Sequence, residues 1–129
     1  ISIFIDKLLK NKPVTVNWGL QTRDFIYVMD IVEVIIKSME YLFNNKSCEV
    51  FNVATGLSIT INDLLSMLSN IMGIQPEIIH KHLPSGDPKQ SCGTNMKMKE
   101  ILNINTDLFV SLEDGLKNTI KYIEGNKSQ

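Results

Sequence analysis

The sequence predicts an α/β fold in which a small mixed sheet is flanked by helices. Two observations support this prediction. Short segments rich in β-branched and aromatic residues alternate along the chain with segments whose apolar residues recur at helical spacing. The intervening helices are long enough to act as crossovers, which indicates that part of the sheet is parallel. A chain of 129 residues can bury a core of its own, so we expect residues 1–124 to form one domain and residues 125–129 a polar tail.

The first expected elements are a helix and a strand. Apolar residues recur on one face of residues 1–10, which predicts a helix that Asn11-Lys12-Pro13 ends. The β-branched run Val14–Val16 then predicts a strand.

The next strand is expected at Phe25–Val28, which is β-branched and aromatic. Asp30 and Glu33 have the D-x-x-E spacing of a capping box, and they predict the start of a helix over residues 31–43. The wide apolar face of that helix indicates that it packs on a sheet and on another helix.

A strand at Glu49–Ala54 and a sharp turn at Thr55-Gly56 are expected to follow. Thr60 and Asp63 form a second capping box, before a helix that Gly73 ends. The remaining predictions are a strand at Glu77–Lys81, a loop at Leu83–Pro88, a helix at Asn95–Leu102, and a helix capped by Ser111 with Asp114 that runs to Glu124.

Composition excludes several classes of function. The net charge is −1 and the charges are interspersed, so no surface for nucleic acid is predicted. No apolar run approaches the length of a membrane span, and no signal peptide is recognisable, so we expect a cytoplasmic protein. Cys48 and Cys92 form no C-x-x-C pair and are expected to be reduced. Because the chain opens inside an apolar segment, we expect it to be part of a longer polypeptide.

Candidate site residues are few. Arg23 is the one arginine among thirteen basic residues, and a planar guanidinium suits bidentate binding of phosphate. The alternative is an exposed arginine paired with Asp24. His80 and His82 would share one side of a strand, but no carboxylate or cysteine stands at a supporting spacing, so no metal site is predicted.

Three sequence blocks occur in a fixed order over nearly the whole chain. They are residues 21–32 (QTRDFIYVMDIV), residues 51–56 (FNVATG), and Gly86-Asp87 followed by residues 111–116 (SLEDGL). Together they resemble the C-terminal part of the NAD-dependent epimerase/dehydratase family, the extended short-chain dehydrogenases, whose members act on nucleotide sugars.

The resemblance implies that the chain completes a larger enzyme of carbohydrate biosynthesis. In this family an N-terminal Rossmann domain binds NAD or NADP. The C-terminal part closes over the nucleotide diphosphate of a UDP-, dTDP-, GDP- or CDP-linked sugar, and the full enzyme is expected to be a homodimer. This chain has no G-x-x-G-x-x-G stretch and no tyrosine followed four residues later by lysine. We therefore expect the chain alone to bind no dinucleotide and to catalyse no reaction.

The resemblance also implies roles for single residues. Arg23 matches an arginine that binds the substrate's phosphates, and Phe25 matches an aromatic position beside the nucleotide. Asp87 matches a carboxylate that accepts hydrogen bonds from ribose hydroxyls, the alternative being a turn aspartate before Pro88. Ile61 matches an apolar residue that contacts the base in some members, although its place on the helix's apolar stripe favours a core role.

Two departures from the family pattern are present. Pro84 stands where most members have a second phosphate-binding arginine, and Lys89 is expected to replace that arginine. Asn17-Trp18 replaces the Gly-Asp that usually precedes Gly19, and Asn17 is expected to supply the left-handed backbone of the turn. Trp18 is either an aromatic platform for the ligand or a lid contact.

Two functions are therefore open. The first is the nucleotide-sugar-binding part of an epimerase or dehydratase whose catalytic tyrosine and lysine lie upstream of Ile1. The second is a stand-alone, non-catalytic binding or interaction module. The sequence before Ile1 would distinguish them, whereas the sugar, the base, the choice of NAD or NADP and the reaction type are left open.

Overall fold

The computed structural model describes residues 1–45 and 48–126. The chain forms two compact units. The first unit contains Ile1–Arg23, Ile59–Ser91 and the chain from Glu113 onward, and the second contains Asp24–Ser58 and Cys92–Leu112. The prediction of an α/β fold with a small sheet and flanking helices is confirmed, although the strands of the described residues form two separate pairs, one parallel and one antiparallel.

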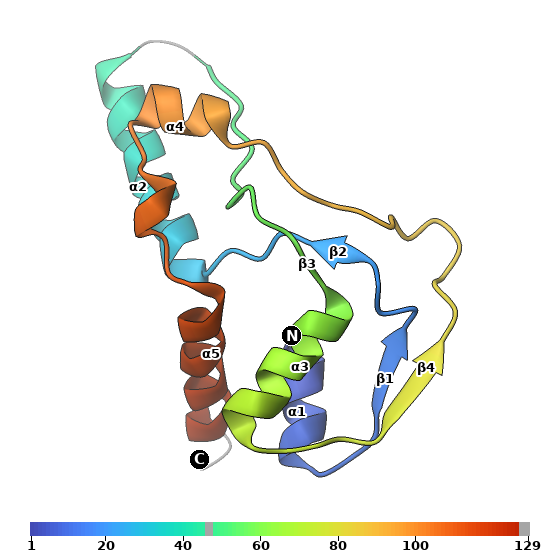
Figure 1. The fold of residues 1–129 in the computed structure, drawn as a ribbon. Helices are drawn as coiled ribbons and strands as arrows, with labels where there is room; N and C mark the ends of the chain where they lie inside the picture. The colour runs from blue at the N-terminus through green and yellow to red at the C-terminus, as the bar shows by residue number, and fades with distance from the viewer. Residues whose placement is uncertain (46–47, 127–129) are drawn as a thin grey trace. The chain divides into compact units, whose positions relative to one another are not determined.

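The parallel pair belongs to the first unit. Strand β1 (Val14–Asn17) lies beside β4 (Ile78–Lys81), with Val14 opposite Ile78 and Val16 opposite His80 (Figure 1). Val14 and Val16 are buried, whereas every residue of β4 is exposed. Both strands were expected from their β-branched residues, and the alternation in β1 gives it one buried face.

Two helices of the first unit also agree with the sequence. Helix α1 (Ser2–Leu9) packs against β1 and against helix α3 (Ile61–Met72). The predicted cap of α3 is present, since the Asp63 N–H donates to Thr60 Oγ1 over 3.0 Å. The helix ends at Gly73, whose φ of +65° is the left-handed conformation typical of a helix terminus.

A second strand pair was not predicted. Strand β2 (Thr22–Arg23) pairs antiparallel with β3 (Ile59–Thr60), with Arg23 opposite Ile59. Each strand has only two residues, too few to produce a recognisable alternation of apolar and polar side chains.

The second unit is built on helices α2 (Val28–Asn44) and α4 (Met96–Leu102), followed by the 3₁₀ turn η1 (Thr106–Leu108). Its core consists of Val34, Met98, Leu102 and Ile104. Helix α4 was expected within a residue of its observed bounds.

Three predictions for the second unit are wrong. Residues 25–27 form no strand, and α2 begins at Val28 instead of residue 31. Asp30 is not a cap, because it lies inside the first turn and its carboxylate accepts the Val110 N–H at 3.2 Å. Glu49–Ala54 is not a strand either, since Phe51 and Val53 pack against the core and pair with no strand among the residues that the structure describes.

Helix α5 (Leu112–Asn126) closes the described chain, and from Glu113 onward it belongs to the first unit. Leu116 and Ile120 are buried. The helix extends two residues beyond the expected end at Glu124, so Gly125 and Asn126 are helical, and the rest of the predicted tail lies outside the described residues.

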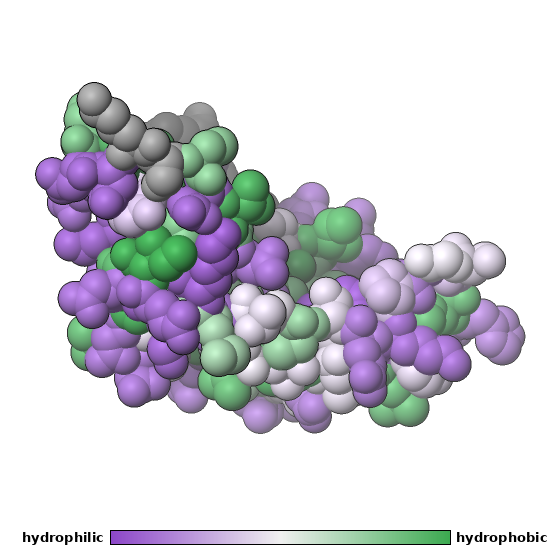
Figure 2. Space-filling model, turned by 90° about the horizontal axis from the view of Figure 1, so that it is seen from above, coloured by the Kyte–Doolittle hydropathy of each residue, from purple (hydrophilic) through white to green (hydrophobic). Residues whose placement is uncertain are grey.

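Many large apolar side chains are exposed. Figure 2 shows hydrophobic residues in several separate places among hydrophilic ones on the face that it draws. Helix α2 contributes many of them, including Ile35, Ile36, Met39 and Phe43. Within the described residues, no helix combines the length and apolarity needed to cross a bilayer.

Candidate functional site

A tight turn leads from β1 to β2 in the first unit. Trp18 has a φ of +62° and Gly19 a φ of +86°. The Trp18 N–H donates to Lys81 O over 2.7 Å, which ties the turn to the end of β4, and Gly19 O accepts the N–H of Asn62 at 2.9 Å. The left-handed residue before Gly19 is therefore Trp18 and not Asn17, which is the last residue of β1. A bulky residue at positive φ is uncommon, because its Cβ crowds the following carbonyl.

Gln21 links this turn to the next strand. It is 6% exposed, its Nε2 donates to Asn17 O over 2.7 Å, and its backbone carbonyl accepts the N–H of Ile61 at 3.1 Å. Arg23 thus follows a segment held by both β1 and the start of α3.

The guanidinium of Arg23 is held by three acceptors within the first unit. Nη1 donates to Thr22 O over 2.7 Å and to Pro88 O over 2.9 Å. Nη2 donates to Asp87 Oδ1 over 2.6 Å, which forms a salt bridge. The Arg23 side chain is 24% exposed, so this cation is partly enclosed and its orientation is defined.

Asp24 is not the partner of Arg23, so the alternative of an exposed arginine paired with its neighbour does not hold. In the second unit, the Asp24 carboxylate accepts the N–H of Thr55 at 3.1 Å, the Thr55 hydroxyl at 2.6 Å and the N–H of Gly56 at 2.9 Å. Gly56 has a φ of +81°. Asp24 therefore stabilises the predicted turn at residues 55–56.

Asp87 reaches Arg23 through a loop that runs along β2. The Thr22 N–H donates to Lys89 O over 3.0 Å, and the Ser91 N–H donates to Thr22 O over 3.1 Å. Asp87 follows Gly86, which has a φ of +84°, and its N–H donates to Pro84 O over 3.2 Å. Asp87 thus closes a turn just before Pro88, and it pairs with Arg23.

Two further candidates lie together in the first unit. The Lys89 ammonium is 5.7 Å from the centroid of the Trp18 ring, within the range of a cation–π contact. Trp18 is 37% exposed and Lys89 is exposed, so both are accessible to a ligand.

The other two candidates are half-buried. Ile61 is the first residue of α3 and directly follows β3, the partner of β2. Phe25 belongs to the second unit. The structure therefore brings together Arg23 with Asp87, and Trp18 with Lys89.

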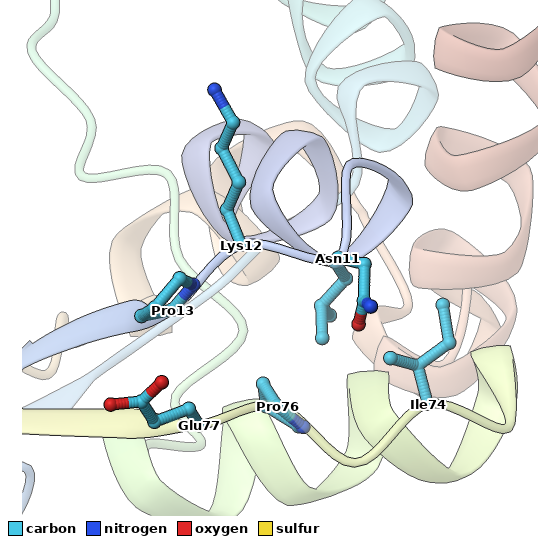
Figure 3. Close-up of a pocket in the computed structure, with 7 residues that line it drawn as sticks. Asn11, Lys12, Pro13, Ile74, Pro76 and Glu77 are labelled. Carbon is cyan, nitrogen blue, oxygen red and sulfur yellow. The ribbon is translucent and has the colours of Figure 1, made fainter.

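Two pockets of the first unit lie at other residues. One of about 210 Å³ is lined by the residues drawn in Figure 3, where the Lys12 side chain points away from the others. Another of about 180 Å³ lies beside Asn62 and Ser69. Both are smaller than the roughly 300 to 1,000 Å³ typical of ligand sites. Among residues 1–45 and 48–126 there is no group of three or more His, Cys, Asp or Glu that could hold a metal ion.

Known proteins resemble the chain over nearly its whole length. Residues 1–54 match the model of the NAD dependent epimerase/dehydratase family. An ADP-L-glycero-D-manno-heptose-6-epimerase of Nitratidesulfovibrio vulgaris is 35% identical over 106 residues, which are 80% of this chain and 32% of that protein.

Solved structures agree with the sequence comparison. The UDP-glucose 4-epimerase of Thermotoga maritima, determined with UDP-glucose, has a TM-score of 0.86 and 34% identity, covering 97% of this chain and 39% of that one. The UDP-glucuronic acid 4-epimerase of Bacillus cereus, in complex with UDP-glucuronic acid and NAD, has a TM-score of 0.77 and 30% identity. This match covers 95% of this chain and 38% of that one.

The fold and these matches define an α/β chain related to nucleotide-sugar epimerases and dehydratases. The chain belongs to the NAD-dependent epimerase/dehydratase family. It spans about two-fifths of the length of the solved relatives, 39% and 38% in the two structures above.

Proposed function

We propose that this chain is the nucleotide-sugar-binding part of an NAD(P)-dependent epimerase or dehydratase, and that Arg23 binds the diphosphate of the substrate. The observation that carries the proposal is the arrangement of Arg23, whose guanidinium is held by Thr22 O, Pro88 O and Asp87. A fixed, planar cation is the side chain best suited to phosphate oxygens.

The donors left on Arg23 support this role. A guanidinium carries five N–H groups, and three of them are used by the acceptors named above. The Nε–H and one Nη2–H are left without a protein acceptor within residues 1–45 and 48–126. Two donors on one planar group can bind two oxygens of a phosphate or diphosphate.

Lys89 supports the proposal through its charge. The Asp87 carboxylate offsets the charge of Arg23, so a diphosphate needs a further cation. Lys89 follows Asp87 by two residues, and its backbone is hydrogen bonded to Thr22. We assign Lys89 to the phosphates and the ring of Trp18, 5.7 Å from the Lys89 ammonium, to the edge of the site.

The remaining assignments rest on the family. Phe25 and Ile61 would lie against the nucleotide, and the base could be that of UDP, dTDP, GDP or CDP. The dinucleotide, NAD or NADP, and the catalytic tyrosine and lysine would belong to a Rossmann part that this chain does not include. The complete enzyme would be a cytoplasmic homodimer.

Calorimetric titration of the chain with UDP-glucose tests the proposal. We expect Arg23→Lys to weaken binding roughly tenfold, because a point charge replaces a bidentate fork worth about 1 to 3 kcal/mol. In the complete enzyme the same change should raise the KM for the nucleotide sugar and leave NAD(P) affinity unchanged.

Lys121→Ala is the matched control, since Lys121 is an exposed cation on α5. It should bind UDP-glucose as the unaltered chain does. Equal affinities of the Arg23→Lys variant and the unaltered chain, or no binding by either, would contradict the proposal.

A further inference from the structure

The Arg23 guanidinium has two backbone acceptors and one side-chain acceptor. Two of its acceptors are the backbone carbonyls of Thr22 and Pro88, and both contact Nη1. Nη2 has one acceptor, Asp87 Oδ1, at 2.6 Å. Rotation of the guanidinium away from its observed plane is therefore opposed at Nη2 by the Asp87 carboxylate.

The backbone near Asp87 is anchored separately from its side chain. The hydrogen bonds between Thr22 and both Lys89 and Ser91 hold the loop along β2. The Asp87 N–H is also bonded within its own turn, to Pro84 O. Removal of the Asp87 carboxylate should thus free the orientation of the Arg23 guanidinium at Nη2 and leave the backbone of the loop in place.

A carboxylate beside a phosphate-binding arginine opposes anion binding electrostatically, because like charges repel. The carboxylate lies 2.6 Å from Nη2. This placement is explained if holding the guanidinium in one orientation stabilises the bound diphosphate more than the repulsion destabilises it. A flexible arginine loses rotamer entropy on binding, and a pre-oriented one loses less.

We propose that Asp87 is a positioning residue: Oδ1 fixes Arg23 so that its Nε–H and second Nη2–H face the diphosphate. This inference rests on the proposed function of Arg23. It differs from the role in ribose binding that the family resemblance implies, because Asp87 acts on the ligand through Arg23.

Repulsion of the diphosphate and positioning of Arg23 predict opposite changes in affinity for the Asp87→Ala variant. If Asp87 only repelled the diphosphate, Asp87→Ala would tighten UDP-glucose binding. If Asp87 positions Arg23, Asp87→Ala weakens binding about tenfold, and Asp87→Asn weakens it less because the amide oxygen can still accept from Nη2. Glu100→Ala, which removes an exposed acid on α4, is the control and should leave the affinity unchanged.

A spectroscopic readout tests the contact without ligand. Since Arg23 is the one arginine of the sequence, ¹⁵N-arginine labelling gives side-chain signals from this residue alone. We expect resolved Nη proton signals in the unaltered chain at low temperature, and averaged Nη2 signals in the Asp87→Ala variant, because Nη2 loses its acceptor and becomes free to rotate about the Cζ–Nη2 bond. Unchanged arginine signals in that variant would overturn the positioning role.

A double-mutant cycle tests whether Asp87 acts through Arg23. In an Arg23→Lys background, we expect Asp87→Ala to change UDP-glucose affinity less than about twofold. Additive effects, together with loss of discrimination against the 2′-deoxyribose analogue of UDP-glucose, would instead identify Asp87 as a ribose ligand and overturn the inference. Absence of binding by the unaltered chain would overturn the proposed function, whereas unchanged arginine signals overturn the positioning role alone.

Discussion

Gly19 shows how a single residue supports the site. Its φ is +86°, and a Cβ placed there would overlap the side chain of Asn62. The backbone of the turn therefore requires glycine at this position for two separate reasons, conformation and space. Because the turn precedes Gln21 and Arg23, its geometry determines where the guanidinium is placed.

Gly19→Ala is expected to lower the free energy of unfolding by about 1 to 3 kcal/mol. Urea denaturation followed by circular dichroism measures this change. Gly125→Ala is the matched control, because Gly125 lies in α5 with negative φ and no atom within 4 Å of an added Cβ. That control should be neutral or stabilising by up to about 1 kcal/mol. If both variants changed the free energy of unfolding by the same amount, the turn would not require glycine at position 19, contrary to this prediction.

At the scale of elements, α2 is apolar on more than one face. Val34 is buried in the core of the second unit, with Tyr41 packed against it. Along the same helix, Ile35 and Met39 are 53% exposed. A helix that is apolar around most of its circumference is typical of an element covered on several sides.

We expect the chain to bind a hydrophobic dye and to self-associate because of this exposed face. The double substitution Ile35→Lys with Met39→Lys should reduce both dye fluorescence and association, because the two residues are one turn apart. Dye titration and analytical ultracentrifugation measure the effects. Glu33→Lys is the control, because it changes the net charge of the same helix by the same two units without removing an apolar side chain. A chain that is monomeric at high concentration and binds no dye would refute this prediction.

At the scale of the whole molecule, the chain spans about two-fifths of the length of its solved relatives. Its sequence has no glycine-rich phosphate-binding turn of the Rossmann type. Such a turn supplies the backbone N–H groups that hold a dinucleotide pyrophosphate at a helix N-terminus.

We therefore expect the chain alone to bind no NADH and to convert no nucleotide sugar. Fluorescence titration with NADH, with UDP-glucose binding measured on the same sample as a control for folding, checks this expectation. Saturable NADH binding in the micromolar range would show that the prediction is wrong.

The sequence by itself determined the elements whose signals are local. Helix α3 is specified by its apolar spacing, by Thr60 at its start and by Gly73 at its end, all within a few residues of one another. Strands β1 and β4 follow from short β-branched runs. The resemblance of three blocks also indicated the family and singled out Arg23 and Asp87 separately.

Tertiary structure decided the features that depend on distant partners. Asp30 was expected to cap α2, but its carboxylate accepts from Val110, 80 residues away. Phe51 lies in a segment with strand composition, yet it packs against a core and pairs with no strand in the described chain. Arg23 binds Asp87 across 64 residues instead of its neighbour Asp24. Composition and spacing report local preference, whereas these choices depend on which groups the folded chain brings within hydrogen-bonding distance.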